Sequence, residues 1–110
     1  MQTEALLPDA RALRCDHVVL NGDMVVVAVS SARSCAACPR CGRTSERVHS
    51  RYLRRLADLP WQGLKVQMHW TCRRFFCGNA ACQQRIFSER IPELAAPDAR
   101  KTHRLAKIMR

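Results

Sequence analysis

The chain has no long apolar segment and no sign of an export leader. None of its apolar stretches approaches the length of about 20 residues that a membrane-spanning helix needs. The first nine residues contain two acids and no base, unlike the basic start of a secretory signal peptide. The sequence therefore predicts a cytoplasmic protein, with no membrane partner, in a compartment that keeps cysteines reduced.

Recognisable catalytic motifs are also missing. The sequence contains no phosphate-binding loop, no HExxH and no Ser/His/Asp arrangement. Its nine acidic residues are scattered, so no carboxylate pair is predicted to act as a general acid and base. We therefore expect no catalytic residues and no enzyme activity from this chain.

Seven cysteines are present, and their spacing indicates a metal site. An odd count without an export signal argues against a disulfide framework. Two pairs each enclose a tight turn, which is the pattern of a closed tetrahedral zinc site. Pro39 and Gly42 favour the first turn, and Gly78 and Asn79 favour the second. The predicted ligands of one structural Zn²⁺ are Cys38, Cys41, Cys77 and Cys82.

Zinc would also supply stability that this chain lacks. A chain of 110 residues fits one small domain, and the segment between the outer cysteines is too short to bury much core. Structural zinc contributes on the order of 10 kcal/mol of apparent binding free energy. We expect residues 38 to 82 to be largely unfolded without the metal.

Three other residues compete for a place at the metal. Cys35 has the same spacing to Cys38 as Cys41 has, but its turn would be built from alanines. His49 is close enough in sequence to complete a site of three cysteines and one histidine. Cys15 has no partner at metal spacing. These alternatives are weaker than the four cysteines, although the sequence leaves Cys35 and His49 open.

Positive charge is concentrated in the cysteine-containing part of the chain. The total is +10, and arginine far outnumbers lysine. Residues 1–32 carry a net charge of −2, residues 33–90 carry +9, and the last twenty residues carry +3. Arginine suits bidentate contacts with phosphate and guanine. The distribution favours a nucleic-acid partner over a merely solvated basic surface.

Two strand pairs are predicted. Residues 16–32 form a β-hairpin, because Asn21-Gly22 separates two runs rich in valine. A second pair joins residues 47–56 to residues 64–76, with the turn between them. In the latter strand, alternate residues are apolar, namely Val66, Met68, Trp70 and Cys72. This parity makes Cys72 a small core residue and not a ligand.

The tail is predicted to form a basic helix. Pro97 and Asp98 suit a first turn, and Leu105, Ile108 and Met109 share one face. The expected fold is a small zinc-stabilised, mainly-β domain resembling a zinc ribbon, with an N-terminal β-hairpin and a C-terminal α-helix. Its expected parts are the hairpin segment 1–34, the four-cysteine domain 35–92 and the basic helix 93–110.

Several separate motifs, in order, resemble the N-terminal zinc-binding domain of a bacterial insertion-sequence transposase family. The resemblance covers residues 15–110 and rests on CPRCG at 38–42, RVHSRY at 47–52, LADLP at 56–60, RRFFC at 73–77 with Cys82, and IFSER at 86–90. It implies the same four zinc ligands and makes the tail the start of a helix-turn-helix. In this family a catalytic domain with an acidic metal-binding triad follows. No such domain is present here, so we expect a truncated transposase without strand-transfer activity.

The sequence thus predicts a zinc-stabilised module that binds DNA at the terminal inverted repeats of a mobile element. The candidate phosphate contacts are Arg47, Arg51, Arg54, Arg55, Arg73 and Arg74. Six such contacts would give a slope of log K against log salt of about −5. The alternative is a zinc-ribbon module for protein contacts or regulation, without DNA specificity. Whether the chain forms a homo-oligomer is left open.

Overall fold

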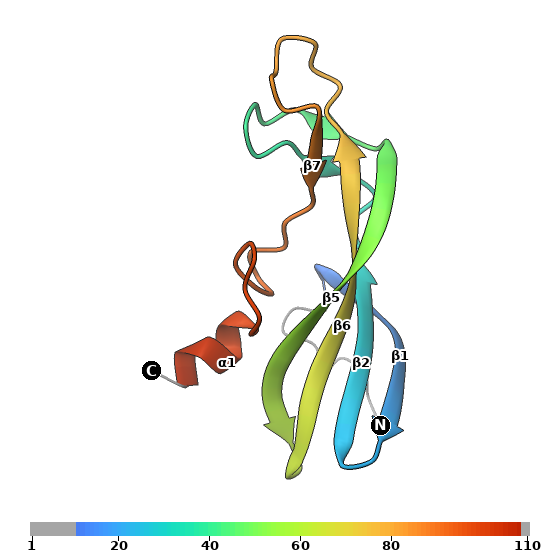
Figure 1. Ribbon diagram of the computed structural model, residues 1–110, viewed down its shortest axis with the longest axis vertical. Helices are drawn as coiled ribbons and strands as arrows, with labels where there is room; N and C mark the ends of the chain where they lie inside the picture. The colour runs from blue at the N-terminus through green and yellow to red at the C-terminus, as the bar shows by residue number, and fades with distance from the viewer. Residues whose placement is uncertain (1–10, 109–110) are drawn as a thin grey trace.

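The computed structural model of the chain describes residues 11–108, and its architecture is mainly β (Figure 1). The molecule is elongated, with extents of 50 × 29 × 22 Å. The elements, in order, are β1 Leu13–Asn21, β2 Met24–Ser31, β3 Ala36–Ala37, β4 Thr44–Ser45, β5 Val48–Trp61, β6 Leu64–Phe76, β7 Ile86–Ser88 and α1 His103–Ile108. The expected mainly-β fold is confirmed.

Strand β6 is the centre of the main sheet, whose order is β1-β2-β6-β5. One edge of β6 pairs antiparallel with β5 along almost its whole length. The other edge pairs with two strands in turn: β2 runs parallel to residues 65–70, and β7 runs antiparallel to residues 74–76. The two long strands therefore connect the hairpin end of the molecule to the end that carries the cysteine pairs (Figure 1).

The N-terminal hairpin forms as predicted, but its turn lies one residue further along. Asn21 pairs with Met24, so the two turn residues are Gly22 and Asp23 and not Asn21 and Gly22. Gly22 has a φ of 65°, which suits the first central position of a type II′ turn. Asn21 can therefore remain in the strand.

Strand β5 continues through residues that were expected to form a loop. It reaches Trp61, and the turn is reduced to Gln62 and Gly63, both with positive φ. Pro60 is tolerated because β5 lies at the sheet edge and its register shifts between Asp58 and Trp61. The loop-like composition was misleading because an edge strand does not need every backbone N–H.

The main core lies on one face of this sheet, here called the core face. Val66, Met68, Trp70 and Cys72 are all buried there, as the alternation predicted. The same face carries the buried valines of β2, which are Val25, Val27 and Val29. Cys72 is fully buried in this cluster, which confirms it as a core residue.

A second, smaller core lies at the cysteine end, on the opposite face. Phe75 is fully buried only three residues after Cys72, so the buried side of β6 changes between them. Phe75 stacks on Phe87 with ring centroids 5.7 Å apart, and Cys38 completes the cluster. Beyond Cys72 the core face of β6 is thus no longer filled by the main core.

The C-terminal helix is attached to β5 through a buried carboxylate. Asp58 is fully buried at its side chain, accepts a 2.7 Å hydrogen bond from the Thr102 hydroxyl and pairs with Arg104. Burial raises the pKa of Asp58, but these contacts outweigh burial and hold it below its usual value. The contacts stabilise the fold above the unfolded-state pKa near 3.8, and this stability is lost as the pH falls through the folded-state pKa.

Helix α1 is shorter than predicted. It spans only His103–Ile108, after Thr102, whose hydroxyl accepts a hydrogen bond from the Leu105 amide. Asp98, expected in the first turn, has a φ of 64° and lies outside the helix. Met109 lies outside the described residues. Among residues 11–108, no helix has the length and hydropathy to cross a membrane.

Asp58→Asn is expected to loosen the C-terminal segment. The substitution keeps the side-chain volume but removes the charge that Arg104 contacts, so the free energy of unfolding should fall by about 2 kcal/mol. Denaturation in urea would measure the change. Asp23→Asn, in the exposed hairpin turn, is the matched control and should cost less than about 0.5 kcal/mol. Equal effects of the two variants would contradict the role assigned to Asp58.

Candidate zinc site and surrounding arginines

Four cysteine sulfurs converge beyond the open end of the β5–β6 pair. The Sγ atoms of Cys38 and Cys82 are 4.0 Å apart, and those of Cys41 and Cys77 are 3.6 Å apart. All four lie within 4.8 Å of one another. Tetrahedral zinc with Zn–S bonds of about 2.3 Å requires sulfurs about 3.8 Å apart. The donor set and its geometry therefore fit one structural Zn²⁺, with the four predicted ligands.

The first cysteine pair is held by a tight turn between two short strands. The Gly42 amide donates to the Cys38 carbonyl at 2.8 Å, and Gly42 has a φ of 81°. The Cys38 amide donates to the Arg43 carbonyl, which closes the loop next to the β3–β4 pairing. Glycine supplies the left-handed conformation that this turn requires.

The second pair is held by Asn79 and by the strand that follows. The Asn79 side chain accepts from the Ala81 amide, and its carbonyl accepts from the Cys82 amide at 3.0 Å. The Cys77 amide donates to the Arg85 carbonyl. This loop has two more residues between its cysteines than the first loop has, and Asn79 is its turn former.

The four residues between Cys77 and Cys82 thus reverse the chain through Asn79, which brings the second pair of sulfurs to the first.

The thiols of this site influence one another. The Arg43 amide donates to the Cys41 sulfur and lowers the pKa of this thiol to about 6. The Asn79 amide lowers the pKa of Cys77, but burial and the neighbouring thiols outweigh it and raise this pKa to about 11. One thiolate therefore forms readily, whereas four together need a cation. Zinc supplies that charge by displacing the remaining protons.

The competing residues lie outside this cluster. Cys35 is half-buried near β3, and Cys15 is half-buried against the main core, where burial raises the pKa of its thiol. His49 packs edge-on against Phe76 at 5.0 Å and contacts the Ser50 hydroxyl. Among the described residues, only the four predicted cysteines form a group able to hold a metal ion.

Two of the six candidate arginines are engaged within the protein. Arg73 forms an ion pair with the buried Glu89 at 2.9 Å and also donates to the Arg33 carbonyl. Arg54 lies over the Trp70 ring and donates to the carbonyls of Ala96 and Ala99. Their contacts hold the segment after β7 against the sheet, a role that the charge pattern did not reveal.

Of the other four arginines, three are exposed and Arg74 is half-buried. By the register of the β5–β6 pairing, Arg51 and Arg55 lie on the face opposite the core face, and both are exposed. Arg47 stacks on Phe76, and Arg74 lies 3.9 Å from the centroid of the Tyr52 ring. The structure therefore divides the predicted set into two side chains with internal contacts, one half-buried side chain over Tyr52, and three exposed side chains.

Sequence reasoning missed the two buried acids as structural residues. Glu89 accepts hydrogen bonds from both the backbone and the side chain of Arg73. Asp58 accepts hydrogen bonds from the Thr102 hydroxyl and from the Arg104 guanidinium. An isolated acid forms no motif, so the only available signal was the scarcity of acids in a basic segment.

Comparison with known families supports the metal site. Residues 35–82 match the family model described as the zinc-finger of transposase IS204/IS1001/IS1096/IS1165. This segment contains all four converging cysteines, so the resemblance based on the sequence motifs is confirmed there. Searches of curated proteins and of solved structures gave no significant match.

Replacing Cys41 by serine should abolish zinc binding, whereas Cys35→Ser should leave about one zinc per chain. Both cysteines have the same spacing from Cys38, so the pair forms a matched comparison. Loss of the ion should also unfold the segment between the cysteine pairs. Metal analysis and circular dichroism would measure the two effects. Zinc retained by Cys41→Ser and lost by Cys35→Ser would refute the assignment.

Proposed function

We propose that this chain, whose residues 35–82 match a transposase zinc finger, is a DNA-binding module of an insertion-sequence transposase. Its target is the DNA of the terminal inverted repeats of the mobile element. The observation that carries the proposal is the pair of exposed arginines, Arg51 and Arg55, on one face of the edge strand β5, with the exposed Arg47 just before that strand.

The spacing of this pair suits a phosphate backbone. Arg51 and Arg55 are exposed and lie four residues apart on one face of β5, whereas the exposed Arg47 precedes β5 and is separated from them by the register shift between Val48 and Ser50. In an extended strand, four residues span about 13 Å, and phosphates of one DNA strand recur every 3.4 Å or so along the axis. The only acid within β5 is Asp58, which is buried. A negative backbone can therefore approach β5 without meeting an exposed carboxylate on that strand.

The zinc site supports this surface without taking part in chemistry. Four thiolates would complete the coordination of Zn²⁺ and would leave no open position for a substrate. The buried acids Asp58 and Glu89 are each paired with an arginine. The proposed role is therefore binding, and this chain is proposed to have no strand-transfer activity of its own.

A protein-interaction role is the second candidate, and one observation favours it. Strand β1 lies at the free edge of the sheet, and Val19 and Leu20 are 47% and 63% exposed. An exposed apolar edge strand can pair with a strand of another protein. Strands β1 and β5 form opposite edges of the sheet, so substitutions in β1 test protein binding separately from DNA binding at β5.

Binding to a duplex that carries the inverted repeat should weaken steeply with salt. Three exposed arginines, each neutralising one phosphate, give a slope of log K against log salt of about −2.7. The double variant Arg51→Gln/Arg55→Gln should make the slope shallower by about 2. Fluorescence anisotropy over a salt series would measure both values.

The control removes the same charge elsewhere. Arg14 and Arg33 are exposed but paired with Asp16 and Glu93, so Arg14→Gln/Arg33→Gln should leave the slope nearly unchanged. Equal losses in the two double variants would indicate a non-specific charge effect and contradict the β5 surface. No binding at low salt would refute the DNA-binding role and favour the β1 edge.

A further inference from the structure

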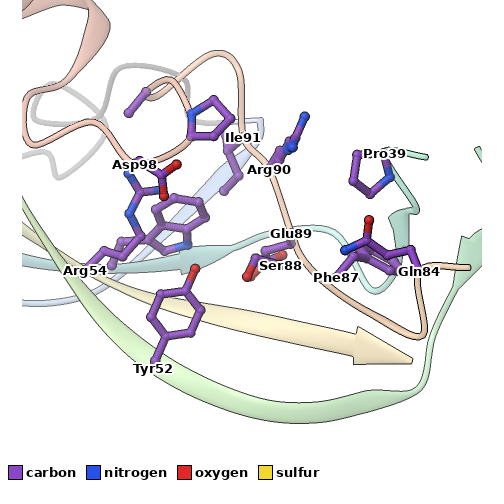
Figure 2. Close-up of a pocket in the computed structure, with 13 residues that line it drawn as sticks. Pro39, Tyr52, Arg54, Gln84, Phe87, Ser88, Glu89, Arg90, Ile91 and Asp98 are labelled. Atoms are coloured by element: carbon purple, nitrogen blue, oxygen red, sulfur yellow. The ribbon is translucent and has the colours of Figure 1, made fainter. Parts of the chain in front are cut away.

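The two sides of strand β5 differ in their surroundings. Tyr52 and Arg54 point to the core face, where they line a cavity between the sheet and the segment that follows β7 (Figure 2). Successive side chains of a strand point to opposite faces, so Arg51, Leu53 and Arg55 lie on the other side, here called the open face. All three are exposed. The open face of β5 is therefore accessible to a large partner.

Leu53 is an apolar residue exposed in the middle of this basic surface. It is 47% exposed and belongs to neither core cluster of the described residues. It lies midway between Arg51 and Arg55, two residues from each. Thr71, its partner on β6, is also exposed and shares its face. The open face thus presents two methyl-bearing side chains beside two cations.

The sheet is narrow at this pair of residues. The pairing of β2 with β6 ends at Trp70, and the pairing of β7 with β6 begins at Arg74. Among residues 11–108, the stretch of β6 between these positions pairs only with β5, and Thr71 belongs to it. The major groove of B-DNA is about 12 Å wide and admits a two-stranded β-ribbon. This stretch of the sheet therefore has a width that the groove accepts.

The charge of the open face also suits DNA. The only acid of β5 and β6 is Asp58, which is buried on the core face. Lys101 is exposed and forms a parallel bridge with Ala57, so it adds a cation to the open face beside β5. The exposed Asp16 lies on β1, at the opposite edge of the sheet. The β5 side of the open face therefore favours a polyanion over an acidic or apolar partner.

We infer that the open face of β5 and β6 enters the major groove and contacts the methyl group of a thymine, an inference that rests on the proposed function. Phosphate contacts of Arg51 and Arg55 hold Leu53 over the groove. Apolar side chains and the threonine methyl are the groups that contact the C5-methyl of thymine, which projects into the major groove. Leu53 and Thr71 thus read sequence, whereas the arginines supply affinity without sequence preference.

The test removes the methyl group from the DNA and leaves the charge of the DNA unchanged. The full chain is titrated with two duplexes of the terminal inverted repeat, one with thymine and one with uracil in place of every thymine. The thymine duplex should bind about fourfold more tightly for each methyl group contacted, as expected for burying one such group. The salt slopes for the two duplexes should be equal, because no phosphate contact changes. Fluorescence anisotropy would measure both quantities.

Leu53→Ala should reduce the preference for thymine to less than about twofold, because only the Thr71 contact remains. Since Leu53 is exposed, zinc content and circular dichroism should stay unchanged. Leu20→Ala is the matched control, because it makes the same truncation at an exposed leucine of β1. This control should keep the full preference for thymine.

Equal affinity of the wild-type chain for the two duplexes, with the salt slope retained, would overturn the inference and leave the proposed function intact. A preference for thymine that Leu53→Ala retains in full would also overturn the inference. Failure to bind either duplex at low salt would overturn both the inference and the proposed function.

Discussion

The four-thiolate cluster is the constraint on which the rest of the structure depends. Strands β5 and β6 are joined by the Gln62-Gly63 turn at one end, and the cysteine pairs join them at the other. Zinc binding on the order of 10 kcal/mol exceeds what the small core of Phe75, Phe87 and Cys38 could supply. The long strand pair is therefore fixed at both ends, and β2, β7 and α1 pack directly on it.

The local patterns in the sequence were sufficient for the metal site and for the core face of β6. Turn chemistry placed the four cysteines, and strict alternation placed Trp70 and Cys72 in the core. Both signals depend only on neighbours along the chain, and local geometry decides them. The same holds for the N-terminal hairpin, whose turn was misplaced by a single residue.

Long-range contacts could not be predicted in this way. The parallel pairing of β2 with β6 has no signature in either strand. Arg54 and Arg73 resemble their exposed neighbours in sequence, and only the position of the segment after β7 makes them internal. The start of α1 was misjudged because Pro97 and Asp98 suit a helix, whereas the Asp58 contact places the cap at Thr102.

The parallel pairing of β2 with β6 also constrains how the chain can fold. Met24 pairs with Lys65, so the connection between these strands contains β3, β4, all of β5 and the first cysteine pair. Closing such a loop costs conformational entropy before its contacts are gained. The hairpin β1–β2 can form early, because its contacts are local. The pairing of β2 with β6 can form only after the β5–β6 pair. Metal availability would thus set the rate at which the sheet is completed, as well as its final stability.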